Sequence, residues 1–420
     1  MDFYSIKEPF SVLIQRLVKN GKGLIPSDHK SVFITLFFAI FTAVTGVRIV
    51  VPLLSIYAHD LGATGLYVGM IFGSFSISRT KLLPFFGWLS DRKGRKPFIV
   101  LGLLSYTLIS FAFIFSKKVE SLILLRFIQG AASAMIMPVV QAYVGEITPK
   151  GSEGYSMGLF NLSMFLSLSL GPLMGGSIKD LLSIDAAFIA MGILSFMGLL
   201  LGLFFLPPVS TEKLRTGERP VVPWASLIMD RALISIFCFR YAYTACICVI
   251  WSFLPLFADR EFGLSGSLTG ILVTLGVFIS GLLQLPMGFA ADRLNRTGMI
   301  ITGELFSSIG ILLSYFASSF SDLVTAVCIF GIGGGISMPA VMACAVLKGD
   351  EKKAMGSVMS LMTMAHSLGM MTGSLAAGVA MDFLSLKMSF PCGAFIMLAG
   401  TLVVLPQPAV KSGSDVKLCP

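Results

Sequence analysis

The stretch GWLSDRKGRKPF, residues 87–98, decides how this chain folds: five of its twelve residues are charged, whereas the whole chain is 55% hydrophobic and 13% charged. A second stretch, GFAADRLNRTG at residues 288–298, repeats it 201 positions later. Four residues recur in the same order: Gly87, Asp91, Arg92 and Arg95 correspond to Gly288, Asp292, Arg293 and Arg296. A charged loop that occurs twice in an apolar chain indicates two related halves.

The composition indicates that the surroundings of this 420-residue chain are lipid. Its mean hydropathy is +0.87, and a soluble protein of this size cannot bury so much apolar surface. The net charge of +9 therefore indicates positive loops on the cytoplasmic side of a membrane rather than a nucleic-acid surface. Three histidines, and seven cysteines without a CxxC spacing, predict neither a metal site nor a disulfide framework.

Twelve apolar runs can each cross a bilayer as a helix, which takes about 20 residues. They are residues 31–57, 66–88, 97–116, 121–145, 156–178, 184–206, 231–257, 267–290, 298–319, 323–347, 356–380 and 387–405. With the N-terminus inside, 21 of the 31 basic residues fall in inner segments and five in outer loops. This bias predicts a multi-pass protein of the plasma (inner) membrane with both termini in the cytoplasm.

A polar stretch divides the runs into two sets of six. The predicted parts are a cytoplasmic N-terminal segment, either amphipathic or disordered, at 1–30, a six-helix bundle at 31–206, a cytoplasmic linker at 207–230, a second six-helix bundle at 231–406 and a cytoplasmic tail at 407–420. Pro52, Gly62 and Pro138 recur as Pro255, Gly263 and Pro339 after 201 to 203 positions. We therefore predict an all-α membrane protein whose two bundles are related by pseudo-two-fold symmetry.

The repeated loop joins the second and third spans of each half on the cytoplasmic side. Gly87 lacks a side chain, so that another helix can approach it closely. Asp91 can meet Arg95 across the turn, and Gly94 lets the chain return to the membrane. We interpret this cluster as a latch that holds two helices in one conformation and releases them in another. A plain topology signal is the alternative, but it does not explain Asp91.

These residues carry a family resemblance that covers the whole chain. GWLSDRKGRK fills every position of G-x-x-x-D-R-x-G-R-K, the loop signature of the major facilitator superfamily, and the second copy has Asn295 in place of the second glycine. The resemblance implies twelve transmembrane helices, two bundles and alternating access. It also implies that the loop arginine, Arg95, pairs with Asp91 and with an acid at the inner end of helix 4, for which Glu146 is placed.

Two further motifs point to the twelve-helix drug:proton antiporter family, which exports tetracyclines and other amphiphiles. RFIQGAAS at 126–133 resembles its helix-4 motif R-x-x-Q-G, which includes Arg126 and Gln129. GPLMGG at 171–176 resembles its helix-5 antiporter motif. Pro172 removes a helix hydrogen bond, which predicts a bend. Three glycines leave one face of the helix without side chains, which predicts a tight helix contact that moves during transport. These glycines are Gly171, Gly175 and Gly176.

Ionisable residues within the spans are candidates for function because they are costly in a bilayer. Five are basic, and one is clearly acidic: Arg48, Arg79, Lys81, Arg126, Arg240 and Glu304. Lys81 can extend to the inner surface, and the others have structural alternatives, such as hydrogen bonds to helix carbonyls or local pairs. His366 is a candidate for titration, or a hydrogen-bonded interior histidine. Tyr241 and Trp251 on helix 7 can supply an aromatic wall.

In the superfamily that the chain resembles, helices 1, 4, 7 and 10 line the central cavity, so that Arg48, Arg126 and Arg240 can face it. These helices contain no acid deep in the span, whereas exporters of cationic drugs generally place a carboxylate there. Arginine binds carboxylate or phosphate through two parallel hydrogen bonds. We therefore expect a secondary exporter, driven by the proton motive force, for a small amphipathic molecule that is anionic or zwitterionic.

Other functions remain open at this stage. An uptake carrier or exchanger for organic anions, or a non-transporting receptor or lipid scramblase of the same fold, fits the same residues. An enzyme is not expected, because the sequence shows no Ser/His/Asp grouping, no metal-ligand spacing and no GxxxxGK loop. We expect a monomer that works without a cofactor, with a small-molecule substrate and the lipid bilayer as its partners and no nucleic acid.

The latch interpretation makes a direct prediction. We expect Asp91→Asn to abolish transport nearly completely, because it removes the acid of the complete loop signature, while folding and membrane insertion persist. Transport by reconstituted protein, compared at equal expression, measures this. A well-expressed Asp91→Asn protein with wild-type transport rates would contradict the latch.

Overall fold

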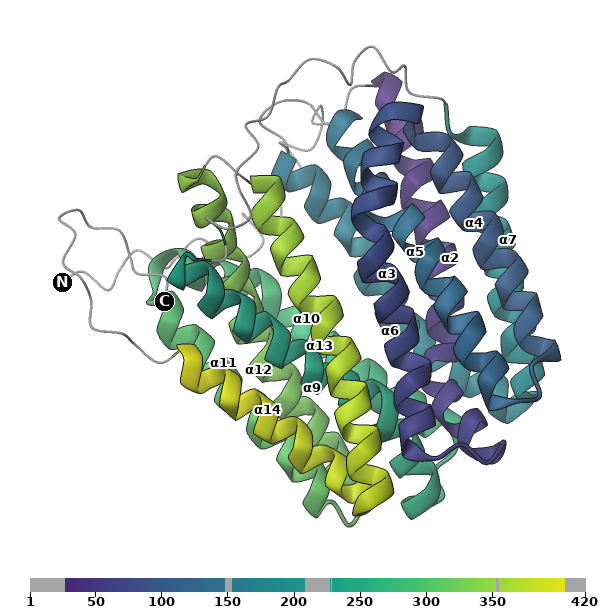
Figure 1. The fold of residues 1–420 in the computed structure, drawn as a ribbon, viewed down its shortest axis with the longest axis vertical. Helices are drawn as coiled ribbons and strands as arrows, with labels where there is room; N and C mark the ends of the chain where they lie inside the picture. Colours follow the sequence, from purple (N-terminus) through teal and green to yellow (C-terminus); the bar gives the residue numbers. More distant parts are fainter. Residues whose placement is uncertain (1–26, 148–152, 208–226, 228, 353–354, 405–420) are drawn as a thin grey trace.

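A computed structural model describes residues 27–147, 153–207, 227, 229–352 and 355–404 (Figure 1). The described residues form twelve α-helices and two short 3-10 turns. The first six helices are α2 (Ser27–Asp60), α3 (Gly65–Lys93), α4 (Arg95–Ala112), α5 (Val119–Ile147), α6 (Glu153–Leu181) and α7 (Ile184–Phe205). The second six are α9 (Arg231–Phe262), α10 (Gly266–Arg293), α11 (Arg296–Phe316), α12 (Phe320–Glu351), α13 (Met355–Phe383) and α14 (Ser389–Val404). The predicted N-terminal segment up to residue 26, most of the linker and the tail lie outside the described residues.

Polar residues just outside the apolar runs fix where several helices begin. The side chains of Ser183 and Ser265 accept hydrogen bonds from the backbone N–H groups of Ala186 and Leu268, which would otherwise lack partners at the first turn. Asp230 begins α9 in the same way. Burial alone would raise the pKa of Asp230, but hydrogen bonds from Lys352 and from the backbone N–H of Leu233 keep this pKa below its usual value.

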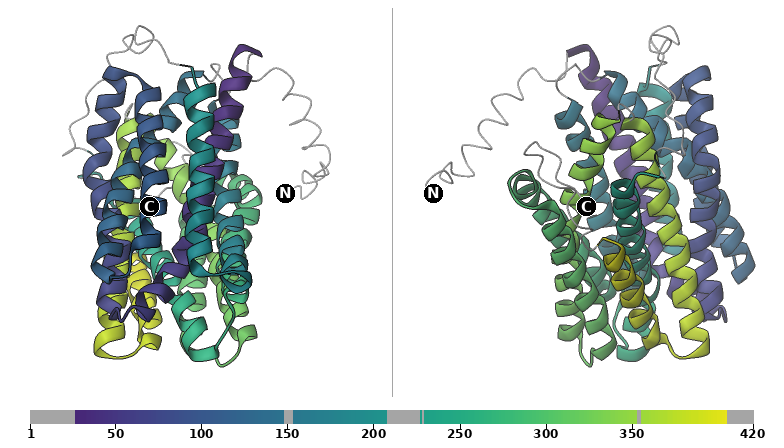
Figure 2. Two further views of the ribbon diagram at one scale, coloured as in Figure 1. Left: turned by 90° about the vertical axis from the view of Figure 1, so that its right-hand side faces the viewer. Right: turned by 60° about the vertical axis from the view of Figure 1, so that its left-hand side comes forward.

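The helices form two bundles of six, as the sequence predicts. α2–α7 pack among themselves, as do α9–α14, and the two sets lie side by side in Figure 1 and in both views of Figure 2. The internal repeat is visible in the backbone, because α2 and α9 are both followed by a glycine of positive φ, 86° at Gly62 and 59° at Gly263. Such a conformation strains any residue with a side chain.

Eight of the described helices are long and apolar enough to cross a membrane by composition alone. The helices outside this group include α3 and α13, which carry glycine, serine or charged residues along their length. They also include α6, several of whose side chains near its start lie outside the described residues. These three helices pack against the opposite bundle, where small residues allow close backbone approach.

The bundles meet along two helix pairs, α3 with α13 and α6 with α10. We call the end with the 60–65 and 262–266 loops the outer end and the opposite end the inner end, after the predicted orientation. Near the outer end, a Cβ on Gly65 or Gly69 of α3 would lie 2.5 Å from a backbone oxygen of α13. A Cβ on Gly73, further inward, would lie 3.6 Å from the nearest described atoms, which include the side chain of Leu375. A Cβ on Gly87 would meet no described atom within 4 Å.

The second pair diverges in the same direction. A Cβ on Gly270 of α10 would lie 2.5 Å from the carbonyl oxygen of Pro172, and one on Gly281 would lie 3.6 Å from the ring of Phe165. A Cβ on Gly288 would meet no described atom within 4 Å. Figure 1 shows the same divergence for α3 and α13, which converge at the lower, outer end. Among the described atoms, the halves are thus in close contact at the outer end and diverge toward the inner end.

Two carboxylates close the outer end by symmetric contacts that the sequence reasoning missed. Asp382, at the end of α13, accepts hydrogen bonds from the backbone N–H groups of Gly65 (2.5 Å) and Leu66 (2.7 Å) at the start of α3. Asp180, at the end of α6, does the same for Gly266 and Ser267 of α10, both at 2.7 Å. Each half thus places an acid on a helix N-terminus of the other half, where the helix dipole favours negative charge.

Ion pairs between the two halves reinforce this closure. Arg260 of α9 pairs with Asp60 of α2, and Lys179 of α6 lies 3.5 Å from Asp259 of α9. These side chains are 24% to 54% exposed, so that each pair contributes at most about 1 kcal/mol. The two carboxylate contacts with helix N-termini, which we call the outer clasps, are the more specific part of the closure.

The outer clasps predict a conformational effect of charge removal. The double variant Asp180→Asn, Asp382→Asn should shift the population toward a state open at the outer end, because each clasp contributes on the order of 0.3–1 kcal/mol, up to about 2. Electron–electron resonance distances between spin labels at Lys117→Cys and Leu384→Cys, on a background whose native cysteines do not label, report this shift as a longer distance.

The control is Glu261→Gln, because the ion pair between Glu261 and Lys387 (3.8 Å) lies within one half. It should leave the distances between the halves unchanged. An unaltered distribution in the double Asp variant would show that the clasps do not hold the outer end closed.

Candidate functional site

Two adjoining cavities lie between the bundles. The first has a volume of about 80 Å³ and is lined mainly by α2, α3, α5 and neighbouring helices of the N-terminal half. The second, of about 230 Å³, is lined mainly by α9, α10 and α12 of the C-terminal half. Trp251 of α9 and His366 of α13 line both cavities. We call them the N-half cavity and the C-half cavity.

Four arginines converge on these cavities. Arg48 of α2, Arg79 of α3 and Arg126 of α5 line the N-half cavity, and Arg240 of α9 lines the C-half cavity. Among the described residues that line either cavity, none is Asp or Glu. The cavities therefore form a region of concentrated positive charge inside the protein, in which Arg48 also experiences the charges of Arg79 and Arg126.

Arg126 is held firmly by its own half. It is 3% exposed, and its Nη1 donates a hydrogen bond to Oε1 of Gln129 at 2.8 Å, while its Nε donates to the carbonyl oxygen of Ile71 at 3.4 Å. The guanidinium carbon lies 4.5 Å from the ring centroid of Phe75 and 5.5 Å from that of Phe72. The R-x-x-Q spacing places Arg126 and Gln129 on the same helix face, one turn apart.

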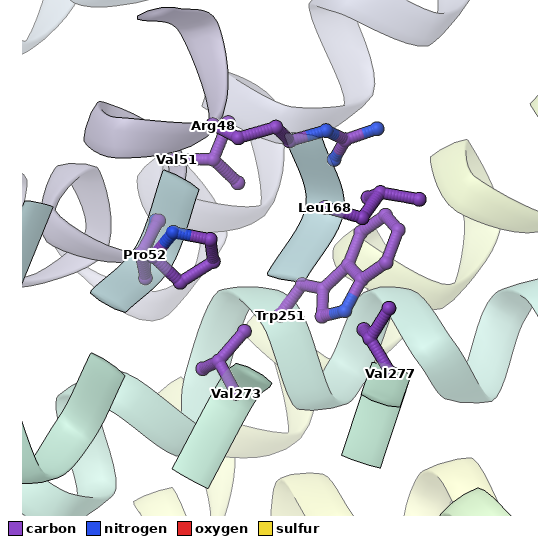
Figure 3. A pocket seen from close by; sticks show the side chains of 8 residues that line it. Arg48, Val51, Pro52, Leu168, Trp251, Val273 and Val277 are labelled. Atoms are coloured by element: carbon purple, nitrogen blue, oxygen red, sulfur yellow. The ribbon is translucent and has the colours of Figure 1, made fainter. Parts of the chain in front are cut away.

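Arg48 bridges the two halves. Its guanidinium carbon lies 4.7 Å from the ring centroid of Trp251, a cation–π contact between α2 and α9 (Figure 3). Gly171 of α6 packs directly on Arg48, because a Cβ there would collide with the Cβ and backbone of Arg48. The first glycine of the GPLMGG stretch thus allows α6 to approach α2 at the arginine that reaches the opposite bundle.

Arg240 contacts His366 across the C-terminal half. Its Nη2 lies 3.3 Å from Nδ1 of His366, and its Nη1 contacts the sulfur of Met338. Thr244, one turn further along α9, has its hydroxyl 3.3 Å from the same imidazole nitrogen. When Arg240 donates to Nδ1 of His366, this nitrogen is the acceptor, because arginine has no acceptor atom. Protonation of this ring would place two positive charges in contact.

Two other candidates, Tyr241 and Glu304, lie away from the cavities. The residues of α9 that line the C-half cavity follow one helical stripe: Arg240, Tyr243, Thr244, Ile247, Ile250 and Trp251. Tyr241 is displaced from this stripe by one residue, or about 100° around the helix. Tyr241 is therefore not among the described lining residues, contrary to expectation, whereas Trp251 is. Glu304 of α11 is fully buried near α14, where its Oε1 would lie 3.9 Å from a Cβ on Gly400.

The structure adds residues that the sequence reasoning missed. Tyr106 and Ser133 line the N-half cavity, and Thr244 and Gln284 line the C-half cavity. Thr244 follows Arg240 by four residues, so helical periodicity alone places both on the same face of the helix. Tyr106 lies on the third helix of its half, and nothing in its sequence surroundings distinguishes it.

The described part of the latch loop shows a tight turn. Gly94 has φ of 88° and joins α3 directly to α4. Arg95 is 6% exposed and donates a hydrogen bond to Oγ of Ser90 at 2.7 Å. In the second copy, Asn295 replaces this glycine and its side chain caps α11 through the N–H groups of Thr297 and Gly298. The expected close helix approach at Gly87 is absent among the described atoms, because the halves diverge toward the inner end.

The remaining latch residues can be placed only in part. The side chains of Asp91, Arg92, Glu146, Asp292 and Arg293 lie outside the described residues, so their pairing stays a prediction. Arg296 is 8% exposed at the start of α11, in the position that corresponds to Arg95.

Comparison with known proteins identifies the class. A family model described as Major Facilitator Superfamily matches residues 36–260 and 234–418, and the chain belongs to this superfamily. It is a multi-pass membrane transporter of small molecules, and its relatives place it near the drug:proton antiporters.

Two curated relatives and one solved structure illustrate this placement. The chain is 29% identical to an uncharacterised MFS-type transporter of Methanocaldococcus jannaschii, over 90% of this chain and 98% of the relative. It is 25% identical to multidrug resistance protein 2 of Bacillus subtilis, over 89% and 94%. Its fold is similar to that of the human organic anion transporter MFSD10 (TETRAN), with a TM-score of 0.64 and 17% identity over 90% of this chain and 99% of that one.

The helix-5 motif yields a prediction that separates its glycines. A Cβ on Gly175 would strike the carbonyl of Ile49 in the same half, whereas one on Gly176 would strike the backbone of Gly266 in the other half. We expect Gly175→Leu to lower the thermal stability of the N-terminal bundle, and Gly176→Leu to open the outer end. Melting temperature in detergent and labelling of outer cysteines measure the two effects. Equal effects of both variants on both measurements would contradict this assignment.

Proposed function

We propose that this transporter is a secondary exporter that carries a small anionic or zwitterionic amphiphile by alternating access. The observation that supports it is the convergence of Arg48, Arg79, Arg126 and Arg240 on cavities with no acid among their described lining residues. A buried arginine costs about 2.5–3.5 kcal/mol on insertion scales. A negatively charged ligand offsets this cost in the working cycle, because arginine binds carboxylate and phosphate in bidentate geometry.

The conformation is consistent with capture from the inner side. The outer clasps and ion pairs close one end, and α3 and α10 diverge from their partners toward the other. We propose that the inner end faces the cytoplasm, as the distribution of basic residues indicates, and that the protein functions as a monomer in the plasma (inner) membrane. Opening of the outer clasps then releases the ligand on the opposite side.

We propose the proton motive force as the energy source. His366 offers a proton-accepting nitrogen at the junction of both cavities, 3.3 Å from Nη2 of Arg240. A proton on this nitrogen would repel Arg240 and compete with it for an anion. This arrangement supports coupling between proton binding and the occupancy of the cavity. By their names, multidrug resistance protein 2 is linked to resistance to several drugs and MFSD10 transports organic anions.

Other functions of the same fold make different predictions in one experiment. An uptake carrier or exchanger for organic anions would show counterflow but no outward movement against a gradient. A receptor would bind the anion without exchange. Counterflow and pH-driven flux in oriented vesicles, with a fluorescent organic anion and a cationic dye of similar size, separate these outcomes.

The binding site makes a quantitative prediction. Arg48→Ala should weaken binding of the organic anion by roughly 2 kcal/mol or more, the range for removing one partner of a buried charge pair. Arg240→Ala should weaken it in the same direction. A neutral ligand should bind nearly as before, because only the charge interaction is lost. Isothermal titration in lipid nanodiscs measures all three.

The control is Lys118→Gln, which removes an exposed cation at the outer surface. It should leave the affinity for the anion unchanged. If the cationic dye binds as well as the anion or better, and neither arginine variant alters its affinity, the arginines are structural and the protein is an exporter of cationic drugs.

A further inference from the structure

The two cavities differ in character. The N-half cavity is small, about 80 Å³, and contains three of the four arginines together with the polar groups of Tyr106 and Ser133. The C-half cavity is larger, about 230 Å³, and has a mainly aromatic and aliphatic lining. This lining includes Tyr243, Ile247, Ile250, Val273, Val277 and Phe330. A ligand that fills both must carry charge at one end and apolar surface at the other.

The arginines of the N-half cavity are not equivalent. Arg126 already donates to Gln129 and to a backbone carbonyl, and it lies against two phenylalanine rings. The guanidinium carbon of Arg48 lies over the face of Trp251, and Nε of Arg79 is buried without a hydrogen-bond partner among the described residues. Two guanidinium groups in this cavity therefore have donors available for a ligand.

Charge balance then sets the number of negative charges on the head. Buried charges are stable only when they are paired, and like charges that line one cavity repel each other. A head with a single negative charge would leave two of the three guanidinium groups of this cavity without a counter-charge. Arg240 is not counted among the groups that bind the head, because its guanidinium already contacts His366 and Met338.

We propose that the two cavities form one bipartite site for an amphiphile with a compact dianionic head, of the phosphate-monoester or phosphonate type, and an aromatic or aliphatic body. The head lies in the N-half cavity between Arg48 and Arg79, and the body lies in the C-half cavity, with Trp251 between them. This inference rests on the proposed function, because it specifies the substrate class of the same site.

The geometry of the head supports phosphate chemistry. Three oxygens on one phosphorus can each accept hydrogen bonds, so that one compact group can bind the forks of two arginines at once. The indole of Trp251, which already contacts Arg48, covers the junction and offers a flat face to the first ring of the body.

A matched pair of probes tests the charge requirement. 1-Naphthyl phosphate is a dianion at about pH 8, because its second pKa is about 6, whereas 1-naphthyl sulfate has the same body and nearly the same head shape with a single charge. 1-Naphthylmethylamine supplies the cation. Isothermal titration of the full chain in nanodiscs should show the phosphate binding about ten-fold or more tightly than the sulfate, and the amine binding most weakly.

Variants assign this preference to the two arginines. Arg79→Gln should weaken the phosphate by about ten-fold or more and abolish its preference over the sulfate, and Arg48→Gln should act in the same direction. Arg79→Lys retains the charge without the fork and should keep part of the preference, which provides a second reading if Arg79→Gln does not fold. Lys118→Gln should leave the affinities for both probes unchanged.

The outcomes separate this inference from the proposed function. Equal affinities for phosphate and sulfate, both above that for the amine, would overturn the dianionic head while the anion carrier stands. A phosphate preference that persists in both the Arg48 and the Arg79 variants would also overturn it. Tighter binding of the amine than of either anion would overturn both proposals.

Discussion

Buried positive charge is the constraint that organises the centre of this transporter. Four arginines from four helices reach two adjoining cavities that have no acid among their described lining residues. The protein holds three of them by different contacts, whereas Nε of Arg79 has no hydrogen-bond partner in the described part of the chain. Gln129 and two aromatic rings hold Arg126, His366 contacts Arg240, and Trp251 covers Arg48. These contacts do not neutralise the positive charge of the arginines. An anionic ligand can do so, because charges in a low-dielectric interior need partners.

The internal repeat places this charge where movement can change its surroundings. Both cavities lie between the halves, so that rocking one bundle against the other alters access to them. Glycines allow the bundles to touch near the outer end, and Asp180 and Asp382 bind helix N-termini across the interface there. These contacts are short and polar, and they depend on the relative position of the halves. They can therefore break without unfolding either bundle.

The sequence predicts the fold closely, because twelve apolar runs and a loop repeated at 201 positions leave few other arrangements. It also identifies Arg48, Arg126 and Arg240 as cavity candidates. It could not show that Arg240 meets His366, since these residues are 126 positions apart and only the packing of α9 on α13 brings them together. The outer clasps were missed because an acid at a helix end resembles an ordinary surface residue. Asp180 and Asp382 are 202 positions apart, close to the 201-residue repeat, and this spacing could have identified them as equivalent residues of the two halves.

The most direct test is an experimental density map of the protein in nanodiscs with 1-naphthyl phosphate bound. The account predicts density for the head group within hydrogen-bonding distance of both Arg48 and Arg79, and for the naphthalene ring beyond Trp251 in the C-half cavity. Density for the ligand elsewhere, or a carboxylate of the protein turned onto both guanidinium groups, would contradict it.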